Sequence, residues 1–380
     1  MKRRVCVVTS SRADYNHLYT LMHGIKKSTK LNLSIIVTGM HTIKEHGLTY
    51  KEIIKDGFEP DAIIKSNQAS SSTKDVLKGM SVQLNKTYNV LSRIKPDIVV
   101  VLGDRYDMYI IALASHVMKI PIAHFHGGEV TTGVIDDALR HSVSKFSDIH
   151  FVADKTFKNR LIQLGESKSK IFNYGSLGID AINQIKFKKR SYLNQINKNL
   201  SNDKYFVISI HPETLNNNNE KLITNTLLSL NNYKEYSIIF SHPNSDPGSL
   251  MILKKIRNYV KHNDNCFITP SFGRYDYLHL LKYSEALIGN SSSGILEAPS
   301  LSIPSVNIGT RQNGRPRCKS VIDSGISFKS INNSIKKALN IDKNKINPRY
   351  KGKNMINKVL TILEKTNLVN IKSKEFSDIL

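Results

Sequence analysis

The sequence has no tryptophan, only three cysteines and far fewer acidic than basic residues. Cys6, Cys266 and Cys318 are an odd set without the paired spacing of a zinc site, so we expect reduced thiols in a cytoplasmic protein. No run of about 18 apolar residues occurs, so we expect no membrane-spanning helix. The start, MKRRVCVVTSSRADY, has only a short apolar run and predicts a first strand instead of a signal peptide.

Several standard active-site motifs are also missing. The sequence contains neither of the glycine-rich phosphate loops, G-x-x-x-x-G-K-[ST] and G-x-G-x-x-G, and the first strand is followed by TSSR. It also lacks G-x-S-x-G, the nucleophile motif of many serine hydrolases. A metal site built from His124, His126, Asp104 and Glu129 has no HExxH motif or cysteine pair to support it. We therefore expect no metal and no redox cofactor.

The charge is strongly basic, with 55 Lys and Arg against 31 Asp and Glu and a formal net charge of +24. Such a balance suggests nucleic-acid binding. The lysines, however, are scattered along the chain among many asparagines, which is typical of a biased genome composition. We expect a small anionic substrate and no nucleic acid.

Short apolar runs alternate with amphipathic stretches along most of the chain. Strands are predicted at 5–8, 33–37, 98–102, 122–125, 149–152, 205–210, 236–240, 266–269, 286–288 and 305–308. Helices are predicted near 15–28, 72–94, 106–118, 134–147, 155–164 and 352–366. This alternation predicts βαβ units in two doubly wound α/β domains. We place them at 1–180 and 204–350, with a linker at 181–203 and a C-terminal helix and tail at 351–380.

Polar residues follow one predicted strand after another. In a doubly wound sheet these positions share the edge at which ligands bind. Two such domains predict a cleft lined by the segments 11–14, 39–41, 103–105, 126–129, 211–213, 242–244, 290–293 and 309–312.

The stretch 286–317 suggests how an anion is held. A buried strand ends at Gly289-Asn290, and Ser291, Ser292 and Ser293 follow at a predicted helix N-terminus, where free N–H groups and the helix dipole favour a diphosphate. Glu297, one turn further on, is placed to accept hydrogen bonds from a pair of sugar hydroxyls. An ordinary serine cap explains the same pattern equally well.

Three carboxylates on the predicted loops are candidates for proton transfer. Asp104 follows a buried strand, Glu129 follows HFHGG, and Asp136 opens a helix together with Asp137. Carboxyls that converge in a desolvated site acquire separated pKa values, as general acids and bases require. The alternative is that the aspartates cap or begin helices. His124 is expected to be structural, whereas His126, beside two glycines, is favoured as functional.

Taken together, the motifs resemble those of a known enzyme family. In chain order they are RADY (12–15), VTGMH (37–41), VLGDRYD (101–107), HFHGGE (124–129), DD (136–137) with RHS (140–142), GS (175–176), HPETL (211–215), GNSSSGILEAPSL (289–301) and RQ (311–312). Over residues 3–325 the chain resembles the hydrolysing UDP-N-acetylglucosamine 2-epimerases of sialic-acid synthesis, in their bacterial capsule-type branch. The resemblance implies a GT-B fold, two Rossmann-like domains with a deep interdomain cleft.

The resemblance also implies roles for individual residues. It assigns the UDP-sugar to Arg12, His211, Asn244, Ser291, Ser292, Glu297 and Arg311, and chemistry to Asp104, Glu129, Asp136, His126 and His211. Arg12 and a cationic His211 are expected to stabilise the departing diphosphate. Many relatives have a glutamate where this chain has His126, which leaves open which residue does that glutamate's work.

The implied reaction is elimination of UDP to a 2-acetamidoglucal, followed by addition of water with inversion at C2, giving N-acetylmannosamine. A related enzyme acting on UDP-N,N′-diacetylbacillosamine would share every motif. The non-hydrolysing epimerase is disfavoured by the RADY and GGE motifs, and a GT-B glycosyltransferase would use the same nucleotide platform. We expect a homodimer that needs no cofactor.

Overall fold

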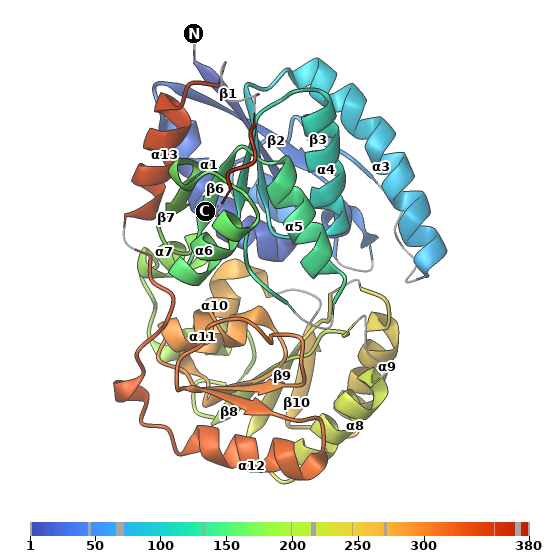
Figure 1. Ribbon diagram of the computed structural model, residues 1–380. Coiled ribbons are helices and arrows are strands. Elements are labelled where there is room, and N and C mark those ends of the chain that lie inside the picture. Colours follow the sequence, from blue (N-terminus) through green and yellow to red (C-terminus); the bar gives the residue numbers. More distant parts are fainter. Residues whose placement is uncertain are drawn as a thin grey trace. The chain divides into compact units, whose positions relative to one another are not determined.

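The computed structural model describes residues 2–44, 47–65, 72–131, 134–198, 200–213, 218–244, 246–269, 272–352, 354–368 and 374–378. The chain forms two compact units (Figure 1). The first comprises Met1–Glu129, Asp136–Gln184 and Tyr350–Leu380, and the second comprises Val130–Ile135 and Ile185–Arg349. The C-terminal segment thus belongs to the first unit, and the stretch 181–203 begins inside a helix of that unit.

Within the described ranges, the first unit holds a seven-stranded parallel sheet in the order β3-β2-β1-β4-β5-β6-β7. Its strands are β1 (Arg3–Thr9), β2 (Leu31–Val37), β3 (Ala62–Ile63), β4 (Ile98–Leu102), β5 (Ile122–Phe125), β6 (Ile149–Val152) and β7 (Ile171–Asn173). Its helices are α1 (Arg12–Lys27), α2 (Tyr50–Lys55), α3 (Thr73–Ile94), α4 (Tyr106–Val117), α5 (Asp136–Phe146), α6 (Lys155–Gln163), α7 (Leu177–Asn183) and α13 (Met355–Lys365), with 3₁₀ helices η1 (Gly39–Thr42) and η3 (Lys168–Lys170).

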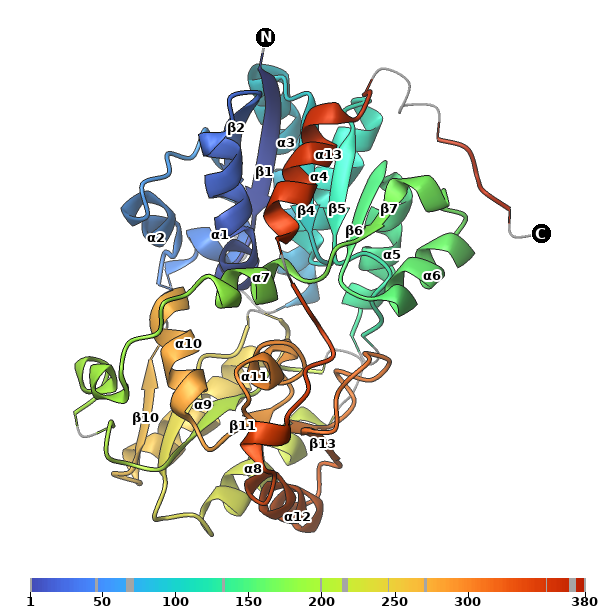
Figure 2. The ribbon, with the colours of Figure 1, turned by 90° about the vertical axis from the view of Figure 1, so that its left-hand side faces the viewer.

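Helices cover both faces of this sheet because β1 is apolar on both sides. Val5 and Val7 pack with α1 and α13, and Figure 2 shows these two helices near each other beside β1. Cys6 and Val8 point the other way and pack with α3 and α4. A strand buried on both faces is a continuous apolar run, which is why β1 is visible in the sequence.

The second unit repeats the plan with six parallel strands among its described residues, in the order β10-β9-β8-β11-β12-β13. The strands are β8 (Tyr205–Ser209), β9 (Ser237–Ser241), β10 (Cys266–Thr269), β11 (Ala286–Gly289), β12 (Ser305–Ile308) and β13 (Val321–Ser324). The helices are α8 (Asn219–Leu230), α9 (Ser249–Lys261), α10 (Gly273–Tyr283), α11 (Glu297–Ser300) and α12 (Phe328–Leu339), with 3₁₀ helices η4 (Arg190–Gln195), η5 (Ser292–Gly294) and η6 (Lys343–Lys345).

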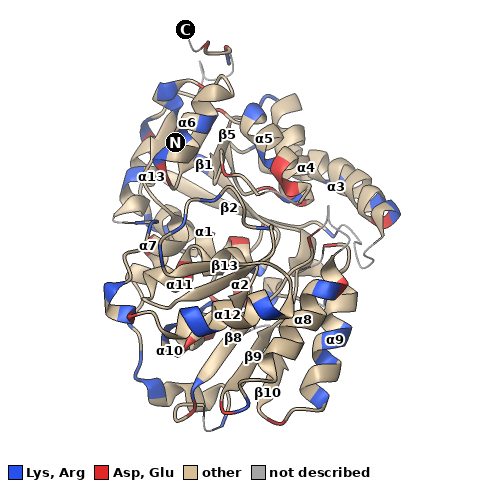
Figure 3. Ribbon diagram, turned by 60° about the horizontal axis from the view of Figure 1, so that its bottom comes forward, with Lys and Arg blue, Asp and Glu red and all other residues tan. Residues whose placement is uncertain are grey.

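The predicted strands are all present, and so are the predicted helices of the first unit, including the C-terminal one. Three short strands, β3, β7 and β13, were not predicted. Cys6, Cys266 and Cys318 are free thiols. Lysine and arginine lie on many separate elements of each unit (Figure 3). In the described part of the chain, no helix has the length and apolarity needed to cross a membrane.

Candidate active site

Both sheets reverse their strand order at a single place, and the candidate residues lie there. In the first unit β1 lies between β2 and β4, so Arg12 and Asp104 follow the two strands that flank the reversal. In the second unit β8 lies between β9 and β11; His211 follows β8, and Asn290 follows β11. Ligands of doubly wound sheets bind at such reversal points.

The first turn of α1 is fixed by two serines that precede Arg12. Ser11 caps the helix by accepting the Asp14 N–H, and Asp14 in return accepts the backbone N–H and the hydroxyl of Ser10 at 3.0 and 2.6 Å. This reciprocal pattern resembles a capping box. It fixes the backbone from which the Arg12 side chain projects.

Arg140 organises the carboxylates of the first unit. Its side chain is 1% exposed and pairs through Nη2 with Asp104. Through Nη1 it donates to the carbonyl oxygen of Glu129 at 3.1 Å and to Asp137 Oδ1 at 3.3 Å. A buried guanidinium is tolerated only where its charge is compensated, so this arginine holds the end of β4, the Glu129 loop and α5 together.

Asp104 and Asp136 have different structural roles. Asp104 does not cap α4, because the N-cap position is Arg105; its carboxylate faces Arg140 and is 20% exposed. The helix-cap alternative for Asp104 is therefore wrong. Asp136 is buried in the first turn of α5, where the dipole favours a negative charge, and lies one turn from Arg140.

His126 and Glu129 form a close pair. Nδ1 of His126 lies 2.5 Å from Glu129 Oε1. An ionised carboxylate only accepts hydrogen bonds, so Nδ1 carries the proton of this hydrogen bond, and in the neutral ring Nε2 carries the lone pair. His126 has a positive φ of 65°, uncommon for a side-chain-bearing residue and therefore a sign of a constrained site. The ring of His17, from α1, packs against it with centroids 5.5 Å apart.

The two glycines after His126 allow this turn. A Cβ on Gly128, which has a φ of +73°, would lie 2.4 Å from the carbonyl oxygen of Phe157. A Cβ on Gly127 would lie 2.9 Å from Ser144 Oγ. Position 128 therefore requires glycine where the loop passes close to α6, and a side chain at position 127 would require Ser144 and His124 to shift.

His124 is structural, as predicted. Its Nε2 donates to the Gly103 carbonyl at 2.8 Å, and Ser144 Oγ lies 3.2 Å from its Nδ1. Burial lowers the pKa of His124 to about 3, so the ring is neutral. With both nitrogens occupied, it offers no ligand to a metal. Among the described residues, no cluster of three or more His, Cys, Asp or Glu has metal-binding geometry.

In the second unit, Asn290 fixes the loop that carries His211. Asn290 Oδ1 accepts the His211 N–H at 2.7 Å, and its Nδ2 donates to the His211 carbonyl at 2.8 Å. The ring is held as well, because the Asn244 N–H donates to His211 Nδ1 at 3.0 Å. A proton on Nδ1 would break that bond, so the geometry favours a neutral imidazole, in contrast to the cationic His211 expected from the sequence.

The helix expected after the serines is not a regular one. Ser291 accepts the Ser293 N–H, but the turn that follows is the 3₁₀ helix η5, and α11 is only four residues long. Pro299 has no N–H to donate to the carbonyl of Ile295, so one continuous α-helix cannot form through this stretch. The extended helix dipole invoked for a diphosphate is therefore not present. Hydroxyls and backbone amides remain near Ser291 and Ser292.

Glu213 holds the loop that carries Arg311. Its carboxylate accepts the backbone N–H groups of Thr310 and Arg311 at 2.7 and 2.9 Å and the Thr310 hydroxyl at 3.0 Å. A Cβ on Gly309, whose φ is +81°, would lie 2.5 Å from Glu213 Oε1. Gln312 then donates to the Asn290 carbonyl at 2.8 Å. Thr214 and Leu215 of the HPETL motif lie outside the described residues.

The candidate residues therefore form two sets. Asp104, His126, Glu129 and Asp136 belong with Arg12 to the first unit. His211, Asn244, Ser291, Ser292, Glu297 and Arg311 belong to the second, where Glu297 is buried at the start of α11. Sequence reasoning assigned no individual role to four residues that organise these sets, namely Arg140, His17, Glu213 and Asn290, although Glu213 and Asn290 lie in segments predicted to line the cleft. Each is a polar residue in or next to a recognised motif, which is the signal that was available.

Two parallel α/β units with polar strand ends at the reversal points define a GT-B-like fold, confirming the predicted fold class. The UDP-GlcNAc 2-epimerase from Methanocaldococcus jannaschii, solved in complex with UDP-GlcNAc and UDP, has a similar fold, with a TM-score of 0.81 at 21% identity over 96% of this chain and all of that one. The model of the UDP-N-acetylglucosamine 2-epimerase family matches residues 23–364. The chain belongs to this family.

Several relatives are similar over most of their length. A GDP/UDP-N,N′-diacetylbacillosamine 2-epimerase (hydrolyzing) from Campylobacter jejuni is 40% identical, covering 86% of this chain and 85% of its own. Polysialic acid biosynthesis protein P7 from Escherichia coli is 35% identical over 99% of this chain and 98% of its own. A UDP-N-acetylglucosamine 2-epimerase from Neisseria meningitidis is 32% identical over 93% and 91%.

Proposed function

We propose that the protein is a hydrolysing 2-epimerase, which converts a UDP-linked 2-acetamido sugar and water into UDP and the free sugar with inverted configuration at C2. One observation carries the proposal: Arg140 links Asp104, the Glu129 loop and the helix of Asp136 in one buried network. The relative at 40% identity, whose name specifies hydrolysis, supports the hydrolytic outcome.

The reaction has two stages in this proposal. The bond from C1 to the diphosphate oxygen breaks first, because the C2 proton is only weakly acidic and positive charge at C1 makes its loss easier. A base then removes that proton, leaving a 2-acetamidoglucal. Water next adds at C1 while an acid delivers a proton to the opposite face of C2. Asp104 and Asp136 are assigned to the stabilisation of charge at C1 and to these proton transfers.

The pair of His126 and Glu129 provides a further base. Because Glu129 fixes the proton of His126 on Nδ1, the lone pair on Nε2 is available to accept a proton. The resulting imidazolium would be stabilised by the Glu129 carboxylate, in the way that a buried aspartate supports the histidine of a catalytic triad. The pair thereby replaces the single glutamate that many relatives carry at the position of His126.

The second unit is assigned to UDP. Ser291 and Ser292 supply hydroxyls and backbone amides for the diphosphate, and Glu297 accepts hydrogen bonds from the ribose. Arg311 adds a positive charge on a loop that Glu213 holds. His211 in its neutral form donates from Nε2 to a phosphate oxygen, and Asn244 fixes the ring for this contact. Arg12, at the start of α1, is assigned to the phosphate side of the substrate.

Two sugars satisfy the proposal. The Campylobacter jejuni relative favours UDP-N,N′-diacetylbacillosamine, and its identity to this chain is higher than that of the other two relatives described above. The Neisseria meningitidis relative, named a UDP-N-acetylglucosamine 2-epimerase, favours UDP-N-acetylglucosamine, and the Escherichia coli relative, named for polysialic acid biosynthesis, is compatible with that sugar. Both sugars carry the 2-acetamido group on which the chemistry depends, so the difference lies in the groups at C4 and C6.

The test is to incubate the purified protein with each sugar nucleotide in heavy water and to identify both products. We expect UDP and a free 2-epimeric sugar that carries deuterium at C2. Release of a UDP-linked epimer would instead indicate the non-hydrolysing reaction, and turnover only with an added acceptor would indicate a glycosyltransferase. A free sugar that keeps its C2 hydrogen and configuration would rule out the proposal. The Asp104→Asn protein, prepared identically, controls for contaminating hydrolases.

A further inference from the structure

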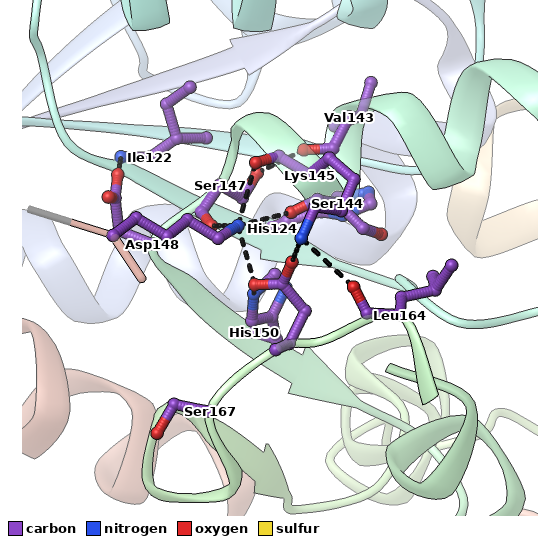
Figure 4. Close-up of polar contacts among 12 residues, drawn as sticks. Ile122, His124, Val143, Ser144, Lys145, Ser147, Asp148, His150, Leu164 and Ser167 are labelled. Atoms are coloured by element: carbon purple, nitrogen blue, oxygen red, sulfur yellow. Dashed lines mark hydrogen bonds and ion pairs between the residues drawn. The ribbon is translucent and has the colours of Figure 1, made fainter. Parts of the chain in front are cut away.

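The C-terminal tail contacts the helix of the proposed acid–base residues. The Lys374 Nζ lies at the C-terminal end of α5, within reach of the carbonyl oxygens of Lys145 at 2.8 Å, Ser147 at 2.7 Å and Ser144 at 3.2 Å. Figure 4 shows Ser144, Lys145 and Ser147 together in this cluster. The last carbonyls of a helix have no partner within the helix, and a cation there also interacts favourably with the negative end of the helix dipole.

The same ammonium group binds a buried carboxylate. Lys374 Nζ lies 2.6 Å from Glu166 Oε2, and the Glu166 side chain is only 2% exposed. A lysine has three N–H donors, which match Lys145, Ser147 and Glu166 as the three short contacts. The Ser144 carbonyl is the longest contact and already accepts the Ser147 N–H. Two donors of Lys374 are therefore used at the end of α5, and the third joins that end to Glu166.

Glu166 connects Lys374 to the sheet of the first unit. It lies 2.9 Å from His150 Nε2 and 2.9 Å from Lys145 Nζ, and Figure 4 shows His150 and Lys145 in the cluster. Burial alone would raise the pKa of Glu166, but His150, Lys374 and Lys145 together lower it to about 2. The carboxylate is thus ionised and holds both lysines. His150 is paired in register with His124, whose ring contacts α5 through Ser144.

The tail has two more contacts at the same place. The Ser377 N–H donates to the Gly165 carbonyl at 2.9 Å. The ring of Phe376 covers Gly165 so closely that a Cβ there would lie 2.3 Å from it. Phe376 also lies over Lys145, with Nζ 5.0 Å from the ring centroid. Residues 374–378 therefore act as a strap across the end of α5 and the turn that follows α6.

We propose that Lys374 is a positioning residue for the proposed reaction, because it fixes the far end of the helix that carries Asp136 and Arg140. The helix is 11 residues long, so a shift at its C-terminal end moves its first turn as well. A displacement of about 1 Å at reacting groups costs on the order of a hundredfold in rate. The kinetic consequence rests on the proposed function, whereas the effect on the helix does not.

The test uses the full chain with three single substitutions. Lys374→Met removes the charge and keeps the length of the side chain, Lys374→Arg keeps the charge, and Lys365→Met makes the same change at an exposed lysine of α13. We expect Lys374→Met to lower kcat about tenfold while KM and UDP affinity stay within about twofold. Lys374→Arg should restore most of kcat, and Lys365→Met should match the wild type.

Hydrogen exchange supplies a readout that does not depend on turnover. In Lys374→Met the amides of α5 should exchange faster along the whole helix, including the turn of Arg140. A lower melting temperature with unchanged kcat and unchanged exchange in α5 would overturn the proposal. If Lys374→Met does not fold, Phe376→Ala replaces it, since the Phe376 side chain is 64% exposed and its removal should disturb folding less. The expected loss of kcat and the faster exchange in α5 are the same in kind but smaller. If the wild type acts on neither sugar, the proposed function fails and the exchange data alone decide the role of Lys374.

Discussion

The side chain of Asn290 holds the backbone of His211 on both sides, because it accepts the His211 N–H at 2.7 Å and donates to the His211 carbonyl at 2.8 Å. The orientation of the amide is fixed, because one partner can only donate and the other can only accept. The pair extends the contact between β8 and β11 beyond Ser209 and Gly289, where the two strands end. Gly289 allows this approach, since a Cβ there would lie 1.9 Å from the Ser209 carbonyl oxygen.

Asn290→Asp should disturb this contact specifically. The carboxylate still accepts the His211 N–H but cannot donate to the carbonyl, so a buried acceptor loses its partner. We expect a loss of about 1–3 kcal/mol in the free energy of unfolding and a weaker affinity for UDP. Chemical denaturation and calorimetric titration on the same samples measure both. Asn313→Asp, at an exposed site in the loop after Arg311, is the control. Unchanged UDP affinity in Asn290→Asp would separate His211 from the nucleotide site.

Glu297→Ala should weaken UDP binding without affecting the fold of the second unit. If Glu297 accepts hydrogen bonds from the ribose, its loss should cost about 1–3 kcal/mol of binding free energy. Isothermal calorimetry with UDP measures this directly. Glu285→Ala is the matched control, because Glu285 precedes β11 instead of following it and pairs with Lys343 at 2.8 Å. Equal UDP affinities in the two variants would remove Glu297 from the site.

The sequence predicted the central strands because they are buried on both faces, but it did not reveal the short edge strands. β3 has two residues, and one of them, Ile63, is exposed. β13 includes the exposed Asp323 within its four residues. An edge strand has one neighbour and less cover, so it does not need a continuous apolar run. The long helix predicted after Ser291 is interrupted, and the reason is local: Pro299 lacks the N–H that a continuous helix would need.

Most candidate residues were predicted from the strand ends, and Asp136 and Glu297 from predicted helix starts, but the contacts that hold them were not predicted. Asn290 lies 79 positions from His211, and Glu213 lies 97 positions from Thr310. No local spacing reports such pairs. They become visible only when the order of the strands brings the loops together. The contact of Arg140 with Asp104 could not be predicted either, because Arg140 lies on α5 whereas Asp104 follows β4.

Two buried histidines should make the fold sensitive to mild acid. Burial lowers the pKa of both His41 and His124 from 6.5 to about 3. The unfolded chain therefore binds protons first as the pH falls below about 6.5, and the folded state loses stability from there down to about pH 3. Denaturation midpoints measured between pH 7 and pH 5 should decrease steadily.

The contribution of each histidine can be separated by substitution. His124→Asn places an amide near the position of Nδ1, beside Ser144 Oγ, leaves the Gly103 carbonyl without its donor and does not titrate in this range. It should be less stable than the wild type at pH 7 and show a shallower loss of stability toward pH 5. His262→Asn, at an exposed position of the second unit, should leave the slope unchanged. An unaltered slope in His124→Asn would mean that other groups bind the protons.

The carboxylates of the first unit provide the most direct test of the chemistry. Asp104→Asn and Asp136→Asn keep the size and most hydrogen bonds of each side chain while removing the charge. Each should lower kcat by about 10²–10⁴-fold, the range for loss of a general acid or base. UDP affinity should stay within about a few fold, because the nucleotide is assigned to the second unit. Glu129→Gln should lower kcat as well, since an amide no longer supports a protonated His126.

Stability must be measured on the same samples, because Asp104 also compensates the buried Arg140. Asp104→Asn is therefore expected to melt at a lower temperature as well as to turn over more slowly, whereas Asp136→Asn should lose less stability. Asp137→Asn is the matched control: it removes the same charge from the same turn of α5, where Asp137 pairs with Arg140 at 3.3 Å. Its turnover should stay within about a few fold of the wild type. If Asp136→Asn and Asp137→Asn have equal, near-normal kcat values, Asp136 serves only to begin the helix, and the proton transfers must be assigned to Asp104 and His126.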